Sequence, residues 1–228
     1  MNQSSQWKKE YKKKGIPSSF RETPSGSAKW YYRILKKNRK IKGKLLDLGC
    51  GKGRNAIFFA EKGFEVYGID FVKEALEEME KKAGKKNLEI KAFCRKVEEK
   101  MPFPNNFFDA AIDIFCYPHI ESKKKQEKYR KELQRVLKET GTCLLSLASD
   151  RDGFYSKFLG TSPEPKNKKI IDPIAHVSKY LYSLEDLEKE FSNEFKIVNF
   201  QEKNKKDFMH GRDYARTTLS FILQKKGN

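Results

Sequence analysis

Short apolar segments that alternate with helical patterns are the feature that most restricts the fold of this chain. They begin at residue 44 and continue almost to the end of the sequence. Strands that alternate with helices at this spacing predict a parallel sheet covered by helices on both faces. The expected strands are residues 44–48, 66–70, 88–93, 108–114, 143–147, 195–200 and 217–224. The expected helices are residues 54–62, 72–83, 122–137 and 183–191, the last with a capping pattern that begins at Ser183.

The net charge of +18 is distributed unevenly over the 228 residues. Residues 1–44 hold fourteen Lys and Arg against two acidic residues, so the rest of the chain carries only +6. The length and a hydrophobic content of 37% suit one domain with an added segment. We expect a basic, aromatic-rich extension over residues 1–43 that could act as a lid, and a domain over 44–228. Within it, residues 150–182 hold three prolines and no clear periodicity, which predicts a lid-like insertion.

The cysteines and the terminus predict a cellular location. Four cysteines are spread without a CxxC pair or a Cys/His cluster, so we expect no metal site and reduced thiols in a cytoplasmic protein. The first residues run directly into Lys8 and Lys9, with no apolar stretch typical of a signal peptide. No uncharged apolar run is long enough to cross a bilayer, so no membrane partner is expected. The sequence leaves the oligomeric state open.

A glycine-rich turn follows the first expected strand, in Leu45-Leu46-Asp47-Leu48-Gly49-Cys50-Gly51-Lys52-Gly53-Arg54-Asn55. Glycines at such a turn allow positive φ and close approach of a ligand to the backbone, and the helix that follows begins with free amides. The second expected strand ends in Asp70, where a carboxylate can accept both ribose hydroxyls. The turn and the acid together predict a nucleotide-type binding site.

The details of the turn discriminate among nucleotides. A P-loop would need Gly-Lys-Ser/Thr, whereas this chain has Gly53-Arg54-Asn55. In a dinucleotide fold the third glycine usually lies two residues further along, and an acid such as Asp47 would be unusual inside the first strand. At the mouth of the loop, Asp47 instead suits a ligand with a positive amino group. S-adenosylmethionine has that ammonium, a ribose and no phosphate.

The chain resembles the class I S-adenosylmethionine-dependent methyltransferases. Residues 47–53 are similar to the first motif of this family, and residues 68–70 to the second. Residues 102–109 (PFPNNFFD) resemble its approach to the fourth strand, and residues 132–141 (ELQRVLKETG) its ELxRVLKPGG segment. Residues 53–66 also resemble the tellurite-resistance and thiopurine branch, whose members methylate small molecules. The resemblance implies an α/β, Rossmann-like methyltransferase fold with a doubly wound, mostly parallel seven-stranded sheet and an antiparallel last strand.

The resemblance also implies which residues bind the cofactor, S-adenosylmethionine. Asp47 and the glycine loop would hold the methionine part and Asp70 the ribose, with Phe71 against the adenine. Many members place an acid near the end of the third strand, and here Glu98 or the backbone around Val97 would take that role. The expected cofactor-binding residues are Asp47, Gly49, Cys50, Gly51, Gly53, Asn55, Asp70, Phe71, Val97, Glu98 and Asp113.

The resemblance places the methyl acceptor beyond the fourth strand, at residues 113–119. His119 could take a proton from the acceptor and Tyr117 could orient it, which makes them the candidate catalytic residues. Capping or packing is the alternative role for His119, and Asp113 could cap a turn instead of lining the cofactor pocket. The candidate substrate-binding residues are Tyr11, Trp30 and Tyr32, as an aromatic lid or simply a docked extension, and Arg151, as a contact for an anionic substrate.

The predicted function is methyl transfer by in-line displacement to a small-molecule acceptor, for which positioning supplies much of the catalysis. One alternative is an RNA methyltransferase whose basic N-terminal segment binds its substrate by phosphate contacts and base stacking. Another is a non-catalytic binding protein with a degenerate methyltransferase fold. Lysines outnumber arginines 39 to 10, and arginine is the better bidentate phosphate ligand. We therefore favour a small-molecule partner over nucleic acid.

Overall fold

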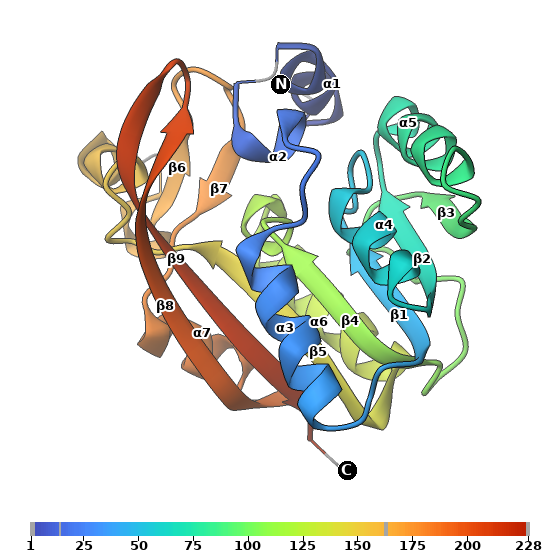
Figure 1. Cartoon of the computed structure of the whole chain (residues 1–228). Coiled ribbons are helices and arrows are strands. Elements are labelled where there is room, and N and C mark those ends of the chain that lie inside the picture. Colours follow the sequence, from blue (N-terminus) through green and yellow to red (C-terminus); the bar gives the residue numbers. More distant parts are fainter. Residues whose placement is uncertain (1–2, 14, 162–163, 227–228) are drawn as a thin grey trace.

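A seven-stranded sheet runs through the centre of the computed structural model, which describes residues 3–13, 15–161 and 164–226 (Figure 1). The strand order is β3-β2-β1-β4-β5-β9-β8. The first five strands pair in parallel, whereas β9 pairs antiparallel with both β5 and β8. The strands are β1 (Gly43–Leu48), β2 (Phe64–Asp70), β3 (Ile90–Cys94), β4 (Phe108–Ile114), β5 (Leu137–Ala148), β8 (Phe195–Met209) and β9 (Arg212–Lys225). The predicted α/β class, with a mostly parallel sheet and an antiparallel last strand, is confirmed.

Three strands extend well beyond their predicted ends. β5 begins at Leu137, directly after a helix, and its register with β4 shifts before Thr142 pairs with Ala110. The hairpin of β8 and β9 remains paired as far as Met209 and Arg212. Its outer half is largely polar and exposed, so it lacks the apolar alternation from which strands are recognised.

Helices cover both faces of the sheet (Figure 1). One face carries α3 (Gly26–Lys37), α4 (Arg54–Glu61) and α5 (Lys73–Gly84), and the other α6 (Lys123–Val136) and α7 (Leu184–Phe191). Each contributes an apolar stripe to the core, as the helical spacing of its apolar residues predicts. No helix within the described ranges is long and apolar enough to cross a membrane.

No helix is predicted over α3, which lies within the expected extension, although Ala28, Tyr31 and Leu35 have helical spacing. Its Tyr31 is fully buried and donates a hydrogen bond to the Thr142 carbonyl at 2.8 Å. Ser25 caps the helix by accepting a hydrogen bond from the Ala28 amide. The lysines at its end are exposed, so this highly charged segment has one buried apolar face and one exposed charged face.

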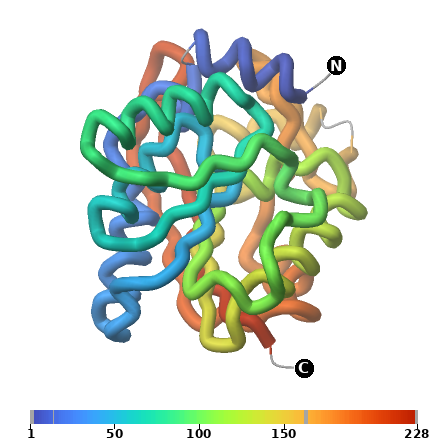
Figure 2. The backbone as a smooth tube through the Cα atoms, turned by 90° about the vertical axis from the view of Figure 1, so that its right-hand side faces the viewer, coloured from blue at the N-terminus to red at the C-terminus, as the bar shows by residue number. Residues whose placement is uncertain are grey.

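The carboxyl ends of β1, β2 and β4 meet at one edge of the sheet, and two segments gather over that edge. One contains α1 (Gln3–Lys13) and α2 (Pro17–Phe20), and the other is the stretch 150–182 (Figure 2). The described part of this stretch, residues 150–161 and 164–182, holds η2 (Tyr155–Thr161), η3 (Pro165–Asn167) and an antiparallel pair, β6 (Lys169–Ile171) and β7 (Ser178–Tyr180). A third apolar cluster joins the two segments, with Trp7 and Ile16 packed among Tyr155, Ile170 and Val177. Elements this short leave no periodicity to detect in the sequence.

The capping pattern at Ser183 is present as predicted and generates a stability test. The Ser183 hydroxyl accepts from the Asp186 amide at 3.2 Å, and the Asp186 carboxylate accepts from the Ser183 amide at 2.8 Å. We expect Ser183→Ala to lower the free energy of unfolding by about 1 kcal/mol, because a helix amide loses its acceptor. Ser192→Ala, at the exposed end of the same helix, should change it by less than about 0.5 kcal/mol. Urea denaturation of both variants measures this, and equal effects would contradict the role of the cap.

Candidate active site

The glycine-rich turn is bent back onto the end of β2. The amides of Gly49 and Cys50 both donate to the Ile69 carbonyl, at 2.8 and 3.0 Å. The Gly51 amide donates to Asp70 Oδ2 at 2.9 Å, and the Val72 amide donates to Asp70 Oδ1 at 2.9 Å. Asp70 is therefore fixed in place by backbone donors, and burial raises its pKa to about 6.

Two positions of the turn require glycine. Gly53 precedes α4 with φ of 79°, and a Cβ there would lie 2.2 Å from Met79 Cγ. Gly51 has φ of 52°, and a Cβ there would lie 2.5 Å from the hydroxyl of Tyr11 on α1. A side chain at either residue would be strained and would clash. The N-terminal helix thus reaches directly onto the loop.

Asp47, at the end of β1, has a carboxylate oxygen without a partner. The residue is 2% exposed, and its Oδ2 has no hydrogen-bond partner among the described residues. Burial, together with the nearby carboxylates of Asp113 and Asp70, raises the pKa of Asp47 to about 8. An unpaired, buried carboxylate is costly, and a bound cation would compensate it.

Asp113 caps a turn, which is the alternative the sequence left open. It is fully buried and accepts hydrogen bonds from the amides of Cys116 and Tyr117, at 3.0 and 3.1 Å, and from the Tyr129 hydroxyl at 2.7 Å. These amides begin η1 (Tyr117–His119), and the first amides of a helical turn need an acceptor outside it. Asp113 lines neither of the two cavities described below, and its carboxylate is used to hold η1; its contact with the cofactor stays a prediction.

Tyr117 faces the core rather than an acceptor. Its ring is fully buried, and its hydroxyl bonds to Glu190 and Arg130, both at 2.7 Å. The turn of η1 directs this side chain between α6 and α7. The predicted role of Tyr117 in orienting the acceptor is therefore wrong, because its hydroxyl is already engaged inside the core.

His119 has a defined tautomer. Its Nδ1 lies 2.8 Å from the Ser178 carbonyl, so Nδ1 carries the proton and Nε2 has the free lone pair. Its ring meets the Trp7 ring edge-on at a centroid distance of 4.9 Å. Burial, followed by the charge of Lys179, lowers the pKa of His119 to about 3. The ring is thus neutral and a weak base.

The first cavity lies at the end of β2, with about 740 Å³ of unfilled space including its mouth. Five of the residues expected to bind a cofactor line it: Gly49, Asp70, Phe71, Val97 and Glu98. Residues of α1 close it from above: Gln3, Ser4, Trp7 and Tyr11. Tyr11 was assigned to the acceptor from the sequence, but the structure places it in this cavity against the glycine loop.

A second cavity adjoins the first and shares Ser18, Phe115 and His119 with it. Trp30, a predicted substrate residue, lines the second cavity. Phe115 adopts φ of 66°, a left-handed conformation that costs a residue with a side chain about 1–2 kcal/mol. In this conformation Phe115 lines both cavities. The sequence contains no signal for the left-handed conformation.

Four predicted site residues lie elsewhere. Tyr32 packs edge-on against Phe58, at 5.7 Å between centroids, and Arg151 is an exposed partner of Glu202 at 2.7 Å. The Asn55 side chain accepts from the Ser25 amide at 2.9 Å and so joins the starts of α3 and α4. Cys50 is buried against Gly68. None of the four lines either cavity, because each is used in packing or pairing.

Comparison with known proteins agrees with this geometry. Residues 45–141 match the model of a methyltransferase domain. An uncharacterized methyltransferase of Bacillus subtilis, YcgJ, is 32% identical over 102 residues, which is 45% of this chain and 39% of that protein. The chain thus spans well under half the length of that relative.

Solved structures share the fold. An S-adenosylmethionine-dependent methyltransferase of Methanosarcina mazei superposes with a TM-score of 0.75 at 22% identity, over 86% of this chain and 99% of that one. The 1,6-didemethyltoxoflavin-N1-methyltransferase of Burkholderia thailandensis, solved with its substrate and S-adenosylhomocysteine, gives 0.73 at 17% identity, over 98% of this chain and 87% of that one.

The sheet and the glycine loop define a class I methyltransferase fold. Residues 45–141 match a methyltransferase domain and the fold is that of S-adenosylmethionine-dependent methyltransferases, so the resemblance found in the sequence is confirmed.

The unpaired carboxylate of Asp47 generates a prediction about stability. A carboxyl whose pKa is raised by folding destabilises the protein once pH exceeds its unfolded pKa, and the effect is complete above its folded pKa of about 8. Asp47→Asn should therefore raise the free energy of unfolding at pH 8 by about 1–3 kcal/mol. The difference from the unsubstituted protein should shrink steadily toward pH 5. Denaturation of the ligand-free proteins across this range measures it, and a pH-independent difference would contradict the assignment.

Proposed function

We propose that the protein transfers a methyl group from S-adenosylmethionine to a small molecule bound in the second cavity. The observation that carries the proposal is the junction of the two cavities. The first is lined by Asp70, the ribose-type acid of a cofactor site, and it adjoins the second at Phe115 and His119. The unpaired acid, Asp47, lies beside the first cavity, close enough to Asp70 for their charges to interact. A methyl donor and an acceptor would meet at the junction.

The residues of the first cavity fit the cofactor. The unpartnered Oδ2 of Asp47 would accept from the ammonium of the methionine part. The Asp70 carboxylate uses part of its acceptor capacity on Gly51 and Val72, which leaves lone pairs for ribose hydroxyls. Phe71 and Val97 offer apolar walls for the adenine, and Glu98 lines the same end while paired with Lys125 at 3.6 Å.

Methyl transfer needs a nucleophile aligned with the bond that breaks. The cofactor supplies an electrophilic methyl on a sulfonium, whose sulfur keeps the electron pair of the broken bond. Phe115 and His119 would position the acceptor at the junction and exclude water. Because Nδ1 donates to the Ser178 carbonyl, Nε2 of His119 would accept a hydrogen bond from the substrate and orient it. The low pKa of His119 makes it a weak general base.

The N-terminal helix acts as a lid in this proposal. Gln3 Nε2 donates to the His119 carbonyl at 2.5 Å, and Lys8 pairs with Glu74 of α5 at 2.9 Å. These contacts tie α1 to both sides of the first cavity, together with the stretch 150–182 that it packs against. Entry of the cofactor would require α1 to move aside.

The RNA alternative has less support. Base stacking needs exposed rings, whereas Trp7 is 8% exposed and Tyr31 is fully buried. The aromatic residues of the N-terminal segment thus form its attachment to the domain. Its lysines remain at the surface, and a steep loss of RNA affinity with added salt would revive this alternative.

Calorimetry with S-adenosylhomocysteine tests the cofactor site. Its ammonium favours ionised Asp47, so binding releases a proton, and affinity should rise as pH approaches the pKa of about 8. Asp47→Asn should weaken binding roughly tenfold or more and flatten this pH dependence. Asp70→Ala should also weaken it strongly. Absence of binding to the unsubstituted protein would refute the cofactor assignment, and an unchanged affinity of both variants would refute these contacts.

Incubation with S-adenosylmethionine and a panel of small molecules tests the reaction. Formation of S-adenosylhomocysteine that depends on an acceptor would support catalysis. Cofactor binding without turnover across the panel would favour the non-catalytic alternative.

His119→Asn tests the positioning role once an acceptor is found. The asparagine amide can still donate to the Ser178 carbonyl, but it lacks Nε2. We expect kcat to fall roughly tenfold or more while the affinity for S-adenosylhomocysteine stays within about twofold. Gln and Ala variants would show whether the hydrogen bond or the ring is needed. A parallel loss of cofactor affinity would instead indicate that His119 supports the Trp7 contact of α1.

A further inference from the structure

The second cavity is strongly basic, in contrast to the first. Its lining holds one acidic residue, Asp207, and seven basic residues: Arg21, Arg33, Arg54, Lys179, Lys203, Lys205 and Arg216. Asp207 is already shared between Arg21 and Lys205. Most of the positive charge around this cavity therefore lacks compensation from the cavity wall.

Lys179 is the most unusual of these residues. It lies on β7 and is 4% exposed, and its ammonium has neither a hydrogen bond nor an ion pair among the described residues. Its ammonium lies 3.6 Å from the centroid of the Tyr155 ring, which lines the same cavity. Burial lowers the pKa of Lys179 to about 7; the nearby carboxylate of Asp172 opposes this shift, and the positive charge of Arg216 adds to it. A buried ammonium without a partner is costly unless it serves a ligand.

Arg216 lies beside Lys179 and is held rigidly. Its Nε donates to Asp152 at 2.7 Å, and its Cζ lies 4.9 Å from the same Tyr155 centroid. Asp152 also accepts from the Thr217 amide at 3.1 Å, so its charge is shared. Nη1 of Arg216 contacts Met209, whereas Nη2 has no hydrogen-bond partner among the described residues. Two cations over one ring thus leave donors available to a ligand.

A third cation approaches from the cofactor side. Arg54 begins α4, an end of the helix where the macrodipole disfavours positive charge. Within the described ranges it has no ion pair or hydrogen bond, and burial lowers its pKa, with a further contribution from Arg21. Arg54 lines the second cavity, and its charge also interacts with Asp47, which lies beside the first.

We propose that the second cavity binds an oxyanion, the carboxylate or phosphate of the methyl acceptor, and that Lys179 and Arg216 are its charged contacts. That the bound anion is the methyl acceptor rests on the proposed function, whereas the anion site itself rests on the lining of the cavity. Lys179 has the buried, unpaired charge, Arg216 adds an oriented guanidinium, and Arg54 adds charge toward the methyl donor. The acceptor is then a small acid rather than a neutral molecule.

The opposite charges of the two cavities support binding of the cofactor in the first and of the anionic acceptor in the second. Asp70 lines the first cavity and Asp47 lies beside it, which suits a cofactor with an ammonium and a sulfonium. An anion would be repelled there and attracted to the second cavity. The acceptor would thus enter with its acid group toward Lys179 and its reactive atom toward His119.

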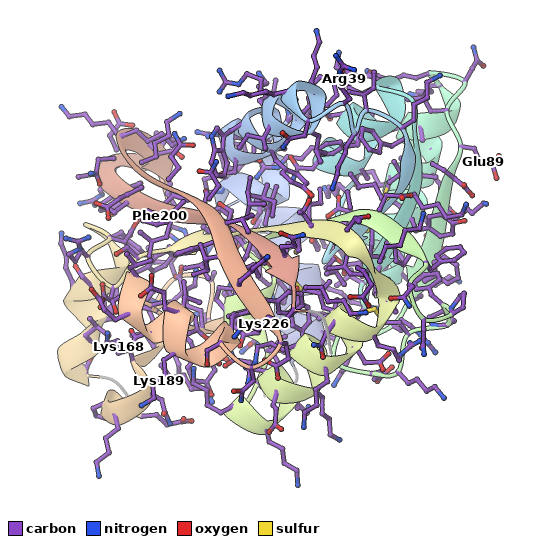
Figure 3. All side chains as sticks on the ribbon, turned by 90° about the horizontal axis from the view of Figure 1, so that it is seen from below. Arg39, Glu89, Lys168, Lys189, Phe200 and Lys226 are labelled. Atoms are coloured by element: carbon purple, nitrogen blue, oxygen red, sulfur yellow. The ribbon has the colours of Figure 1, made fainter. Side chains whose placement is uncertain are left out.

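Lys179→Met is the appropriate test, because methionine keeps the length and apolar contacts of the side chain. Arg216 is unsuitable, since its removal would leave buried Asp152 unpaired. The matched control is Lys189→Met, on the exposed face of α7 (Figure 3). All proteins are saturated with S-adenosylhomocysteine and titrated calorimetrically, at constant ionic strength, with inorganic phosphate, benzoate and neutral benzamide.

We expect phosphate or benzoate to bind the unsubstituted complex, and Lys179→Met to weaken that binding roughly tenfold or more. Lys189→Met should bind like the unsubstituted protein, and benzamide should show no dependence on Lys179. The preferred anion tells whether a carboxylate or a phosphate is the natural group. Without ligands, Lys179→Met should melt at a higher temperature, because a buried unpaired charge has been removed.

Two outcomes would overturn the anion site: the unsubstituted complex binds neither anion, or Lys179→Met binds them equally well. Affinity for S-adenosylhomocysteine should be unchanged in Lys179→Met, which shows that the variant is folded. If the unsubstituted protein binds the anions but not S-adenosylhomocysteine, the proposed function fails and the anion site stands.

Discussion

Three carboxylates end neighbouring strands of the sheet, and the rest of the site depends on how each is compensated. Asp47, Asp70 and Asp113 come together because parallel strands β1, β2 and β4 all end at one edge. Asp70 is satisfied by backbone amides of the glycine turn and of the start of α5, and Asp113 by the amides of η1 and by Tyr129. Asp47 keeps one oxygen without a partner. Asp70 and Asp113 therefore stabilise the loops at the ends of their strands, and Asp47 remains available to a cation.

The second cavity, on the other side of Phe115, also has a buried charged group without a partner, but there the charge is positive. There the unpaired group is the ammonium of Lys179, buried against Tyr155 in a cavity with few acids. A buried charge without a hydrogen-bond or ion-pair partner thus lies at each cavity: Asp47 beside the first, and Lys179 in the lining of the second. Such groups lower stability in the free protein, and a ligand of opposite charge recovers the loss. Since Phe115 and His119 separate the two, a cationic methyl donor and an anionic acceptor would be held on opposite sides of one junction.

The contacts of the basic N-terminal segment show that it packs on the domain. Its net charge suggests a surface for polyanions, yet its apolar and aromatic side chains face the domain. Trp7 meets His119, Tyr31 bonds to β5, and Tyr11 reaches the glycine loop. The lysines lie on the outside because they are the residues that packing does not use. The segment is therefore part of the walls of both cavities rather than an arm.

The sequence alone determined the alternation of strands and helices, the glycine turn, Asp47 and Asp70, because each is encoded by residues close together in the chain. It missed α3 and the outer part of the β8–β9 hairpin, whose buried residues are diluted by charged ones. Only the tertiary structure decided that Tyr117 and Asp113 serve the core, and that Lys179, one of 39 lysines, is buried. The reason is physical: a local pattern records propensity and periodicity, whereas a cavity and an unpaired charge arise from residues far apart in sequence. Phe115, His119 and Lys179 acquire their roles only where β4, β7 and the N-terminal helix meet.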